Sequence, residues 1–174
     1  MPKAPFTERN GWKLYLHPAF SQGREALIRT VEALAKRQPL TFRDHPKAKL
    51  LRRIQDLVLV EIPRDPNASE FQLGNTLGTA CRHWRRAKFL GRFRLFFRFS
   101  SAHKIIVYAW VNDETTLRKA GAGSDPYAVF NRRLQTGCPP DDWDRLLREA
   151  EAANPPLDPD RKRKADKPEG RRRT

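Results

Sequence analysis

One segment, RHWRRAKFLGRFRLFFR at positions 82–98, constrains the fold of this chain more than any other. It holds seven arginine or lysine residues and no acidic residue. From Arg92 onward, one side of the segment carries arginines and a phenylalanine and the other only Phe and Leu, the period of two that is typical of a half-buried strand. Gly91 can form the turn that joins this strand to the alternating run at 84–89. The segment therefore predicts an antiparallel hairpin whose basic residues share one surface.

The basic surface of this hairpin indicates an anionic partner. Like charges that face each other across a sheet repel, so a surface this rich in arginine is costly unless an anion offsets it. Guanidinium groups meet phosphate with paired hydrogen bonds, which makes phosphate the favoured partner. The net charge of the whole chain is +15, and this balance favours nucleic acid over acidic proteins or membrane. A solvated, salt-bridged face is the alternative interpretation.

Part of this charge lies in a separate C-terminal segment. Residues Arg161 to Thr174 include eight basic and two acidic residues, so they contribute +6 and leave +9 for residues 1–160. The segment has no apolar residue larger than Ala165 and cannot bury a core of its own. We expect one folded domain over residues 1–155, followed by a disordered basic tail over 156–174 that adds non-specific affinity for polyanions.

The composition is that of a water-soluble chain, with 32% charged and 39% hydrophobic residues. No apolar run approaches the length of a membrane span, and the opening MPKAPFTERN lacks the apolar segment of a signal peptide. Two cysteines, Cys81 and Cys138, are too few and too far apart for a disulfide framework or a metal knuckle. The expected location is the cytoplasm, without membrane contact.

The remaining periodicities predict an α+β fold. An alternating strand at 11–17, ended by Pro18, precedes two amphipathic helices, one between Ser21 and Pro39 and one from Asp44 or Pro46 to Pro63. A β-branched and aromatic strand at 104–113 follows the basic hairpin and completes a three-stranded antiparallel meander. Capping residues then predict helices from Pro126 to Gly137 and from Asp141 or Asp142 onward. We expect an antiparallel sheet of about four strands, with the two N-terminal helices on one face and the other face open for the arginines.

Several segments resemble a known family. These are GWKLYLHPAF, LGN-x-LG, W-x-RAKF, GRFRLFFRF, VYAWVNDETTLRK-x-G, DPYAVF and PPDDW. Together they are similar to the YhaV toxin family, a branch of the RelE/ParE superfamily of bacterial toxin–antitoxin systems, over about residues 10–150. The resemblance implies a RelE/ParE-like fold and a type II toxin that is a ribosome-dependent endoribonuclease, an mRNA interferase that cuts translated mRNA and so inhibits growth. It also implies a co-encoded antitoxin of the PrlF type with an AbrB-like DNA-binding fold, which together with the toxin represses their operon by binding operator DNA.

The chemistry of RNA cleavage fits the basic surface. Without a metal or other cofactor, the ribose 2′-hydroxyl attacks the adjacent phosphate, so a site must take one proton, deliver another and hold a doubly charged phosphorane. No convincing metal cluster is visible, because Asp113 and Glu114 are adjacent rather than convergent and the four histidines are scattered. Arg86, in the W-x-RAKF segment, is the first choice for stabilising the phosphate. Lys88 and Arg94 are expected beside it on the paired strands.

The proton-transfer group is left open between three residues. His83 has an unperturbed pKa suited to acid–base work near neutrality, Glu114 follows the third strand, and Tyr127 begins a helix. For His83, a partly buried structural histidine is the alternative interpretation. The residues expected to bind or position RNA are Arg85, Arg92, Arg98, Asn112, Asp113 and Arg118, with Arg85 pointing to the opposite side of its strand. For Asn112, Asp113 and Arg118, bracing of the site is the alternative role.

Two alternatives belong to other functional classes. The same arginines suit a non-enzymatic nucleic-acid-binding component that holds phosphates at an operator or on the ribosome. An inhibitor of the ParE kind that acts on a protein target is a third possibility. Codon preference, the identity of the general base and the stoichiometry with an antitoxin lie beyond what the sequence specifies.

Overall fold

The computed structural model describes residues 5–153, so the predicted tail at 156–174 lies outside the described residues. Within this range the chain forms five strands and five α-helices, with short 3₁₀ turns and a π-helical segment at Leu57–Glu61 between them. No helix among these residues has the length and apolar character of a bilayer span. The strands are β1 (Thr7–Arg9), β2 (Trp12–Leu16), β3 (Arg85–Phe89), β4 (Phe93–Ser100) and β5 (Ile105–Val111); the helices are α1 (Pro18–Arg37), α2 (Pro46–Asp56), α3 (Ile62–Arg64), α4 (Pro126–Thr136) and α5 (Trp143–Ala153).

The sheet has the strand order β1-β2-β5-β4-β3. Strands β3, β4 and β5 form the predicted antiparallel meander, and in the hairpin Lys88 lies opposite Arg94 and Arg86 opposite Phe96. The expected antiparallel sheet of about four strands is corrected in two respects. Strand β2 runs parallel to β5, and β1 adds a fifth strand beside β2. Alternation of side chains does not specify strand direction, and a strand of three residues is too short to show a period.

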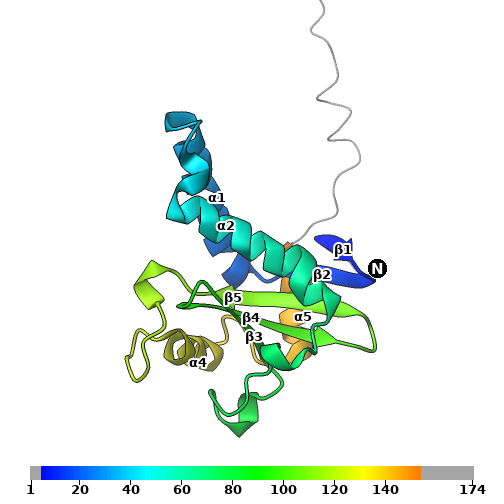
Figure 1. Ribbon diagram of the computed structural model, residues 1–174. Coiled ribbons are helices and arrows are strands. Elements are labelled where there is room, and N and C mark those ends of the chain that lie inside the picture. The colour runs from blue at the N-terminus through cyan, green and yellow to red at the C-terminus, as the bar shows by residue number, and fades with distance from the viewer. Residues whose placement is uncertain (1–4, 154–174) are drawn as a thin grey trace, which may run out of the picture.

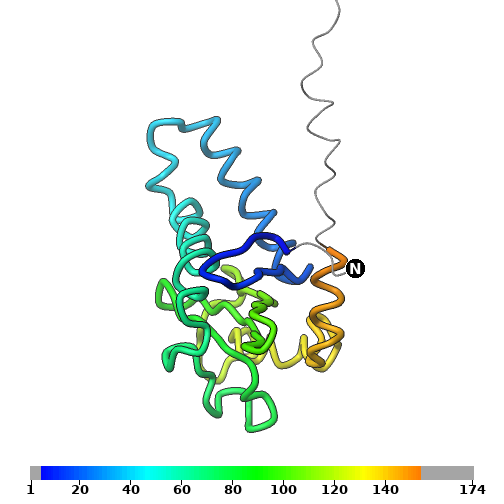
Figure 2. Tube along the Cα trace, turned by 90° about the vertical axis from the view of Figure 1, so that its right-hand side faces the viewer, coloured from blue at the N-terminus to red at the C-terminus, as the bar shows by residue number. Residues whose placement is uncertain are grey.

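The N-terminal helices cover one face of the sheet, as predicted (Figure 1). Phe20 of α1 and Leu50 and Ile54 of α2 are buried against sheet residues such as Leu95 and Phe97. Figures 1 and 2 show α1 and α2 side by side, with their far ends projecting beyond the sheet. The apolar stripe of α1 is therefore only partly core: Leu34 is buried, and the other residues of the stripe, Leu27, Ile28, Val31 and Ala35, are half-buried.

The second face of the sheet is not open. Helices α4 and α5 cover it, and their Phe130, Leu146 and Ala150 are fully buried with Phe96 and Trp110. The expectation of an open arginine face is thus wrong, because the arginines of β3 and β4 share this face with apolar residues that need a second helical layer. Arg86 and Arg94 of the hairpin are therefore buried between two layers, while Lys88 and Arg92 near its turn are exposed.

His17 links the end of β2 to both helical layers and predicts a pH dependence of stability. Its Nδ1 accepts the Ala19 N–H at 3.1 Å as the N-cap of α1, and its Nε2 lies 3.3 Å from Glu149 of α5. Burial lowers the pKa of His17, and the nearby Glu149 only partly offsets this effect. The folded chain therefore favours the neutral imidazole, whose Nδ1 can accept the capping bond.

A histidine with a lowered pKa in the folded state contributes stability that is present above about pH 6.5, the ordinary histidine value, and is lost as pH falls below it. We expect the free energy of unfolding in urea to fall between pH 7 and pH 5.5. In His17→Asn, whose side chain can still cap the helix, that fall should be smaller. An identical pH dependence in the two proteins would assign it to other groups.

Candidate active site

Two buried arginines meet at one tyrosine hydroxyl. The Arg86 Nε–H donates to the Tyr127 hydroxyl oxygen at 2.8 Å, and the Arg94 Nε–H donates to the same oxygen at 3.1 Å. Arg86 is 8% exposed, Arg94 6% and Tyr127 6%. Because a phenol oxygen has two lone pairs, these two bonds occupy its acceptor capacity. The remaining hydrogen-bonding function of Tyr127 is donation of its own O–H proton.

The β3–β4 hairpin and the start of α4 bring these groups together. Arg86 and Arg94 belong to the alternate positions of paired strands that face α4, and Tyr127 is the second residue of α4. Further backbone bonds fix each guanidinium: Nη1 of Arg86 donates to the carbonyls of Glu70 and Gln72, and Nη1 of Arg94 to those of Gly91 and Phe93.

Neither arginine is neutralised by a carboxylate. Among residues 5–153, no Asp or Glu oxygen lies within 4.0 Å of a guanidinium nitrogen of Arg86 or Arg94. Their Nη2 groups have no hydrogen-bond partner among the same residues, and neither is among the fully buried atoms that lack one. Two desolvated positive charges side by side are costly. Their Nη2 donors therefore reach solvent, where an anion can offset the cost.

A third arginine, Arg118, lies over the ring of Tyr127. Its guanidinium carbon lies 4.9 Å from the centre of the Tyr127 ring, and its Nη1 is 2.5 Å from Asp125 Oδ1. Asp125 also caps α4 by accepting the Tyr127 N–H at 3.2 Å. The sequence predicted either Ser124 or Asp125 as the cap of this helix, and the structure shows that it is Asp125. The pairing of Asp125 with Arg118 had no signal in the sequence, because a loop joins the two residues. Arg118 thus braces the tyrosine, and its charge has a carboxylate partner.

Lys88 and Arg92 lie on the solvent side of this cluster. Lys88 is exposed and faces Arg94 across the hairpin. Arg92 is exposed and donates through Nε to the Arg118 carbonyl at 3.1 Å. Both add positive charge at the mouth of the site, as expected for groups that attract a polyanion.

Asn112 and Asp113 are engaged in local backbone structure. The Asn112 Oδ1 accepts the Arg94 N–H at 2.7 Å, and its Nδ2 donates to the carbonyls of Arg92 and Thr116. The Asp113 carboxylate caps the following turn. Burial on its own raises the pKa of Asp113, but hydrogen bonds from Thr115 and Thr116 outweigh it and hold the pKa below its ordinary value. Through these contacts, Asn112 and Asp113 stabilise the backbone where β4 begins and β5 ends.

Glu114 lies away from the arginines. Its carboxylate pairs with Lys47 of α2 at 2.9 Å, and both residues line a cavity of about 300 Å³ between the N-terminal helices and the end of β5. The structure therefore brings Tyr127 to Arg86 and Arg94 but places Glu114 on the side of the N-terminal helices.

His83 and Arg98 belong to a second cluster at the open end of the hairpin, opposite the turn that contains Gly91. The Asp141 carboxylate accepts the Trp84 Nε1–H at 2.7 Å and lies 2.7 Å from His83 Nε2. Burial by itself raises the pKa of Asp141, yet these two hydrogen bonds and the charge of Arg98 hold it below its ordinary value. Asp141 was predicted only as a possible helix start, and its place in the PPDDW segment was the one signal of a further role.

Arg85 points to the opposite side of β3, as predicted. Its guanidinium carbon lies 5.5 Å from the centre of the Phe99 ring, and Nη1 donates to the carbonyls of Arg82 and Trp84. Burial lowers the pKa of Arg85. It therefore lies apart from both clusters.

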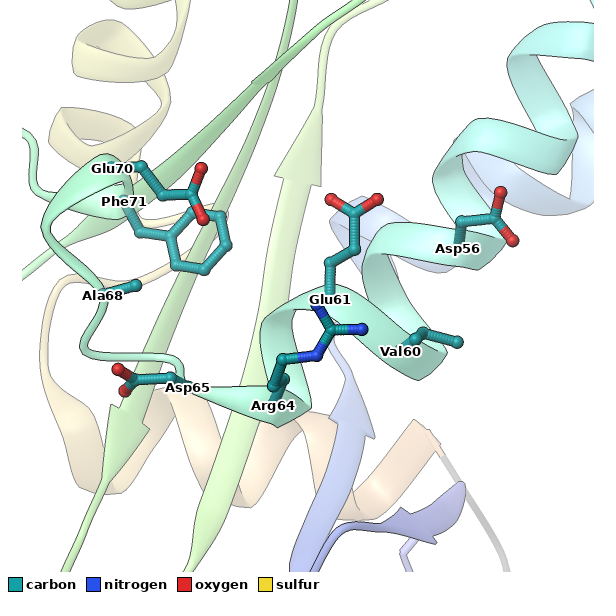
Figure 3. A pocket seen from close by; sticks show the side chains of 8 residues that line it. All are labelled: Asp56, Val60, Glu61, Arg64, Asp65, Ala68, Glu70 and Phe71. Atoms are coloured by element: carbon teal, nitrogen blue, oxygen red, sulfur yellow. The ribbon is translucent and has the colours of Figure 1, made fainter.

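A cavity of about 380 Å³ opens beside α3 (Figure 3). Figure 3 shows the carboxylates of Asp56, Glu61 and Glu70 around it, with Arg64 between the two sides. With Asp65, four acidic residues and one arginine line this cavity, so its electrostatic field opposes RNA phosphates. Elsewhere too, residues 5–153 gather no group of three or more His, Cys, Asp or Glu side chains suited to a metal ion.

Comparison with known proteins assigns the chain to a family. Residues 14–151 match the sequence profile of a family described as a toxin with endonuclease activity, of a toxin–antitoxin system. The chain belongs to the YhaV toxin family. It is therefore a toxin with endonuclease activity from a toxin–antitoxin system, and such a toxin has an antitoxin partner.

Curated relatives cover nearly the same region. The chain is 41% identical over 144 residues to the ribonuclease toxin YhaV of Escherichia coli K12. The matched region covers 82% of this chain and 94% of that protein. It is 40% identical over 147 residues to toxin YhaV of Escherichia coli O6:H1, covering 83% and 96%. No solved structure matches the chain significantly. The matched region contains every residue of the two clusters.

Proposed function

We propose that this toxin is an endoribonuclease that cuts translated mRNA, and that the scissile phosphate binds at Arg86 and Arg94. One observation carries the proposal: among residues 5–153, two buried guanidinium groups without carboxylate partners share the Tyr127 hydroxyl and keep Nη2 donors that are unpaired but not fully buried. Donors that are fixed before the substrate arrives stabilise developing negative charge with little reorganisation. The ribonuclease name of the Escherichia coli K12 relative supports RNA as the substrate.

The proposed reaction needs no group from outside the protein and RNA. The ribose 2′-oxygen attacks the adjacent phosphorus and loses its proton, the bond from phosphorus to the 5′-oxygen breaks, and that oxygen takes up a proton. The products are a 2′,3′-cyclic phosphate and a 5′-hydroxyl. Arg86 and Arg94 hold the non-bridging oxygens, and Tyr127, whose O–H is its remaining donor, protonates the leaving oxygen. His83 and Glu114 stay predictions for the proton acceptor, and Lys88 contributes positive charge at the entrance.

The proposed biological setting follows the family. Cleavage takes place on ribosome-bound mRNA in the cytoplasm, and a PrlF-type antitoxin neutralises the toxin and joins it in repressing their operon. An acidic, amphipathic antitoxin segment over the hairpin end would complement the exposed Lys88 and Arg92.

Mapping of RNA ends in a reconstituted translation system tests this proposal. The reactions contain the wild-type toxin with ribosomes, the wild-type toxin without ribosomes, and Arg86→Ala with ribosomes. New mRNA ends at the ribosomal A site that need both the wild-type toxin and ribosomes are the expected result. If RNA is bound but no ends form in any reaction, the arginines serve binding alone and the non-enzymatic alternative replaces the proposal.

The C-terminal basic segment gives a separate prediction. Deletion of residues 161–174 removes +6 of charge, so we expect weaker RNA binding and a shallower salt dependence of affinity. Cleavage at saturating RNA should persist, because every residue of the proposed site lies within residues 83–127. Binding titrations at several salt concentrations and single-turnover cleavage measure the two effects. Complete loss of cleavage would show that the segment takes part in the reaction.

A further inference from the structure

Contacts with neighbouring residues hold the Arg98 guanidinium in place outside the Arg86–Tyr127–Arg94 cluster. Its guanidinium carbon lies 5.6 Å from the centre of the Trp84 ring and 5.4 Å from that of Trp143. Its Nη1 donates to the Asp141 carbonyl at 2.6 Å. Two indole rings and one hydrogen bond thus fix the guanidinium plane, and they do so through contacts that leave its charge in place.

The edge of the Arg98 guanidinium that is suited to phosphate, formed by Nε and Nη2, makes no hydrogen bond to residues 5–153. Arg98 Nε and Nη2 have no hydrogen-bond partner among residues 5–153, and neither is among the fully buried atoms that lack one. These two N–H groups lie along one edge and point the same way, the fork that binds two oxygens of a phosphate. The neighbouring Asp141 carboxylate is already engaged by Trp84 and His83. Partial burial lowers the pKa of Arg98, and the charges of Asp141 and Asp142 offset this effect only in part, so the charge of Arg98 carries a desolvation cost that a bound anion would reduce.

The position of Arg98 places it in line with the proposed reaction centre. Arg94 and Arg98 lie on the same side of β4, about 13 Å apart along an extended strand, and the register with β5 shifts between Phe96 and Phe97. Arg86 is opposite Phe96 and therefore diagonal to Arg98, at about 7–8 Å between Cα atoms. The buried rings of Phe96, Phe130 and Trp84 pack one against the next from Tyr127 to Arg98, so apolar side chains separate the two groups of arginines.

We propose that Arg98, held between Trp84 and Trp143, binds a second backbone phosphate of the RNA, separate from the scissile phosphate at Arg86 and Arg94. The proposal rests on the proposed function in one respect, namely that the polyanion is RNA. A second anchor fixes the direction of the strand across the β3–β4 hairpin. It contributes to binding and register, while the chemistry takes place at Arg86 and Arg94.

The first test measures affinity for a 2′-O-methyl oligoribonucleotide, which lacks the attacking hydroxyl and is not cut by the proposed route. For Arg98→Gln we expect about tenfold weaker binding and a salt slope shallower by about 0.7, the value for one lost phosphate contact on a single strand. Arg98→Lys keeps the charge but not the fork, so the slope should recover while binding stays weaker. Arg9→Gln, at the opposite edge of the sheet, is the matched control. Equal binding by Arg98→Gln and Arg9→Gln would overturn the proposal.

A second test needs no protein variant. One phosphate at a time is replaced by an uncharged methylphosphonate in the same oligoribonucleotide, and binding to the wild-type toxin is measured. Two separated positions of strong interference are expected, and a single position would overturn the second anchor. The proposed function is judged separately by cleavage of natural RNA. If the toxin cleaves RNA but only one position interferes, the proposed nuclease activity stands and the second phosphate site at Arg98 is refuted. If two positions interfere but RNA is not cleaved, the second phosphate site stands and the nuclease proposal is refuted.

Discussion

We expect Arg86→Ala to lower the rate of RNA cleavage at saturating substrate by about a thousandfold, as removal of a fixed donor to a developing charge does elsewhere. Arg86 donates to the Tyr127 hydroxyl through Nε, and in the proposed reaction its Nη2 also donates to the phosphorane. Both contributions are lost together. RNA affinity should fall much less, because Lys88 and Arg94 keep positive charge at the same place. Single-turnover cleavage and a parallel binding titration separate the two effects.

Matched variants distinguish this role from general loss of structure. Arg86 also donates to the carbonyls of Glu70 and Gln72, so some loss of stability is expected on its removal. Arg9 donates to the Glu8 carbonyl on β1, far along the sheet, and Arg9→Ala should cleave normally. Arg86→Lys keeps the charge but not the geometry, and we expect it to remain strongly impaired. Near-normal cleavage by Arg86→Lys would reduce the role of Arg86 to net charge.

Tyr127→Phe is expected to have the second-largest effect. Without the hydroxyl, the Nε–H groups of Arg86 and Arg94 lose their shared acceptor, and each unsatisfied buried donor costs about 1–3 kcal/mol of folding free energy. Cleavage should fall by at least about a hundredfold if the same hydroxyl protonates the leaving oxygen. Urea unfolding and single-turnover cleavage measure the two losses on one variant.

Tyr108→Phe is a close control for this change. The Tyr108 hydroxyl is buried and donates to the Val58 carbonyl at 2.7 Å, on the face of the sheet covered by α1 and α2. Its removal should lower stability and leave the cleavage rate of the folded protein unchanged. If Tyr127→Phe loses stability but cleaves at the Tyr108→Phe rate, the tyrosine only positions the arginines and another group supplies the proton.

The sequence predicted the hairpin that carries the site but not its surroundings. Alternation along β3 and β4 correctly placed Arg86 and Arg94 on one side and Phe93 and Leu95 on the other. It could not show that α4 and α5 cover the arginine side, because alternation records which residues share a face and not whether that face is exposed. An arginine buried beneath a helix and one in solvent have the same periodicity.

Local sequence patterns likewise could not predict that the Tyr127 hydroxyl contacts Arg86 and Arg94. Tyr127 was predicted as a proton-transfer group from its place at the start of a helix, and the arginines as phosphate ligands from the hairpin. Only the packing of α4 on β4 brings these residues, 41 and 33 positions apart, to hydrogen-bonding distance. Glu114 shows the reverse case, since its position after β5 was predicted correctly but its side chain pairs with Lys47 of α2.

The chemical nature of the cut ends tests the central claim most directly. The reaction would be run with EDTA on bare RNA, or with ribosomes in minimal magnesium, and a matched substrate would carry a single 2′-deoxy residue at the mapped position. We predict ends with a 2′,3′-cyclic phosphate and a 5′-hydroxyl, and no cleavage at the 2′-deoxy position. Ends with a 3′-hydroxyl and a 5′-phosphate, or cleavage at the 2′-deoxy position, would contradict attack by the 2′-hydroxyl at the Arg86–Tyr127–Arg94 cluster.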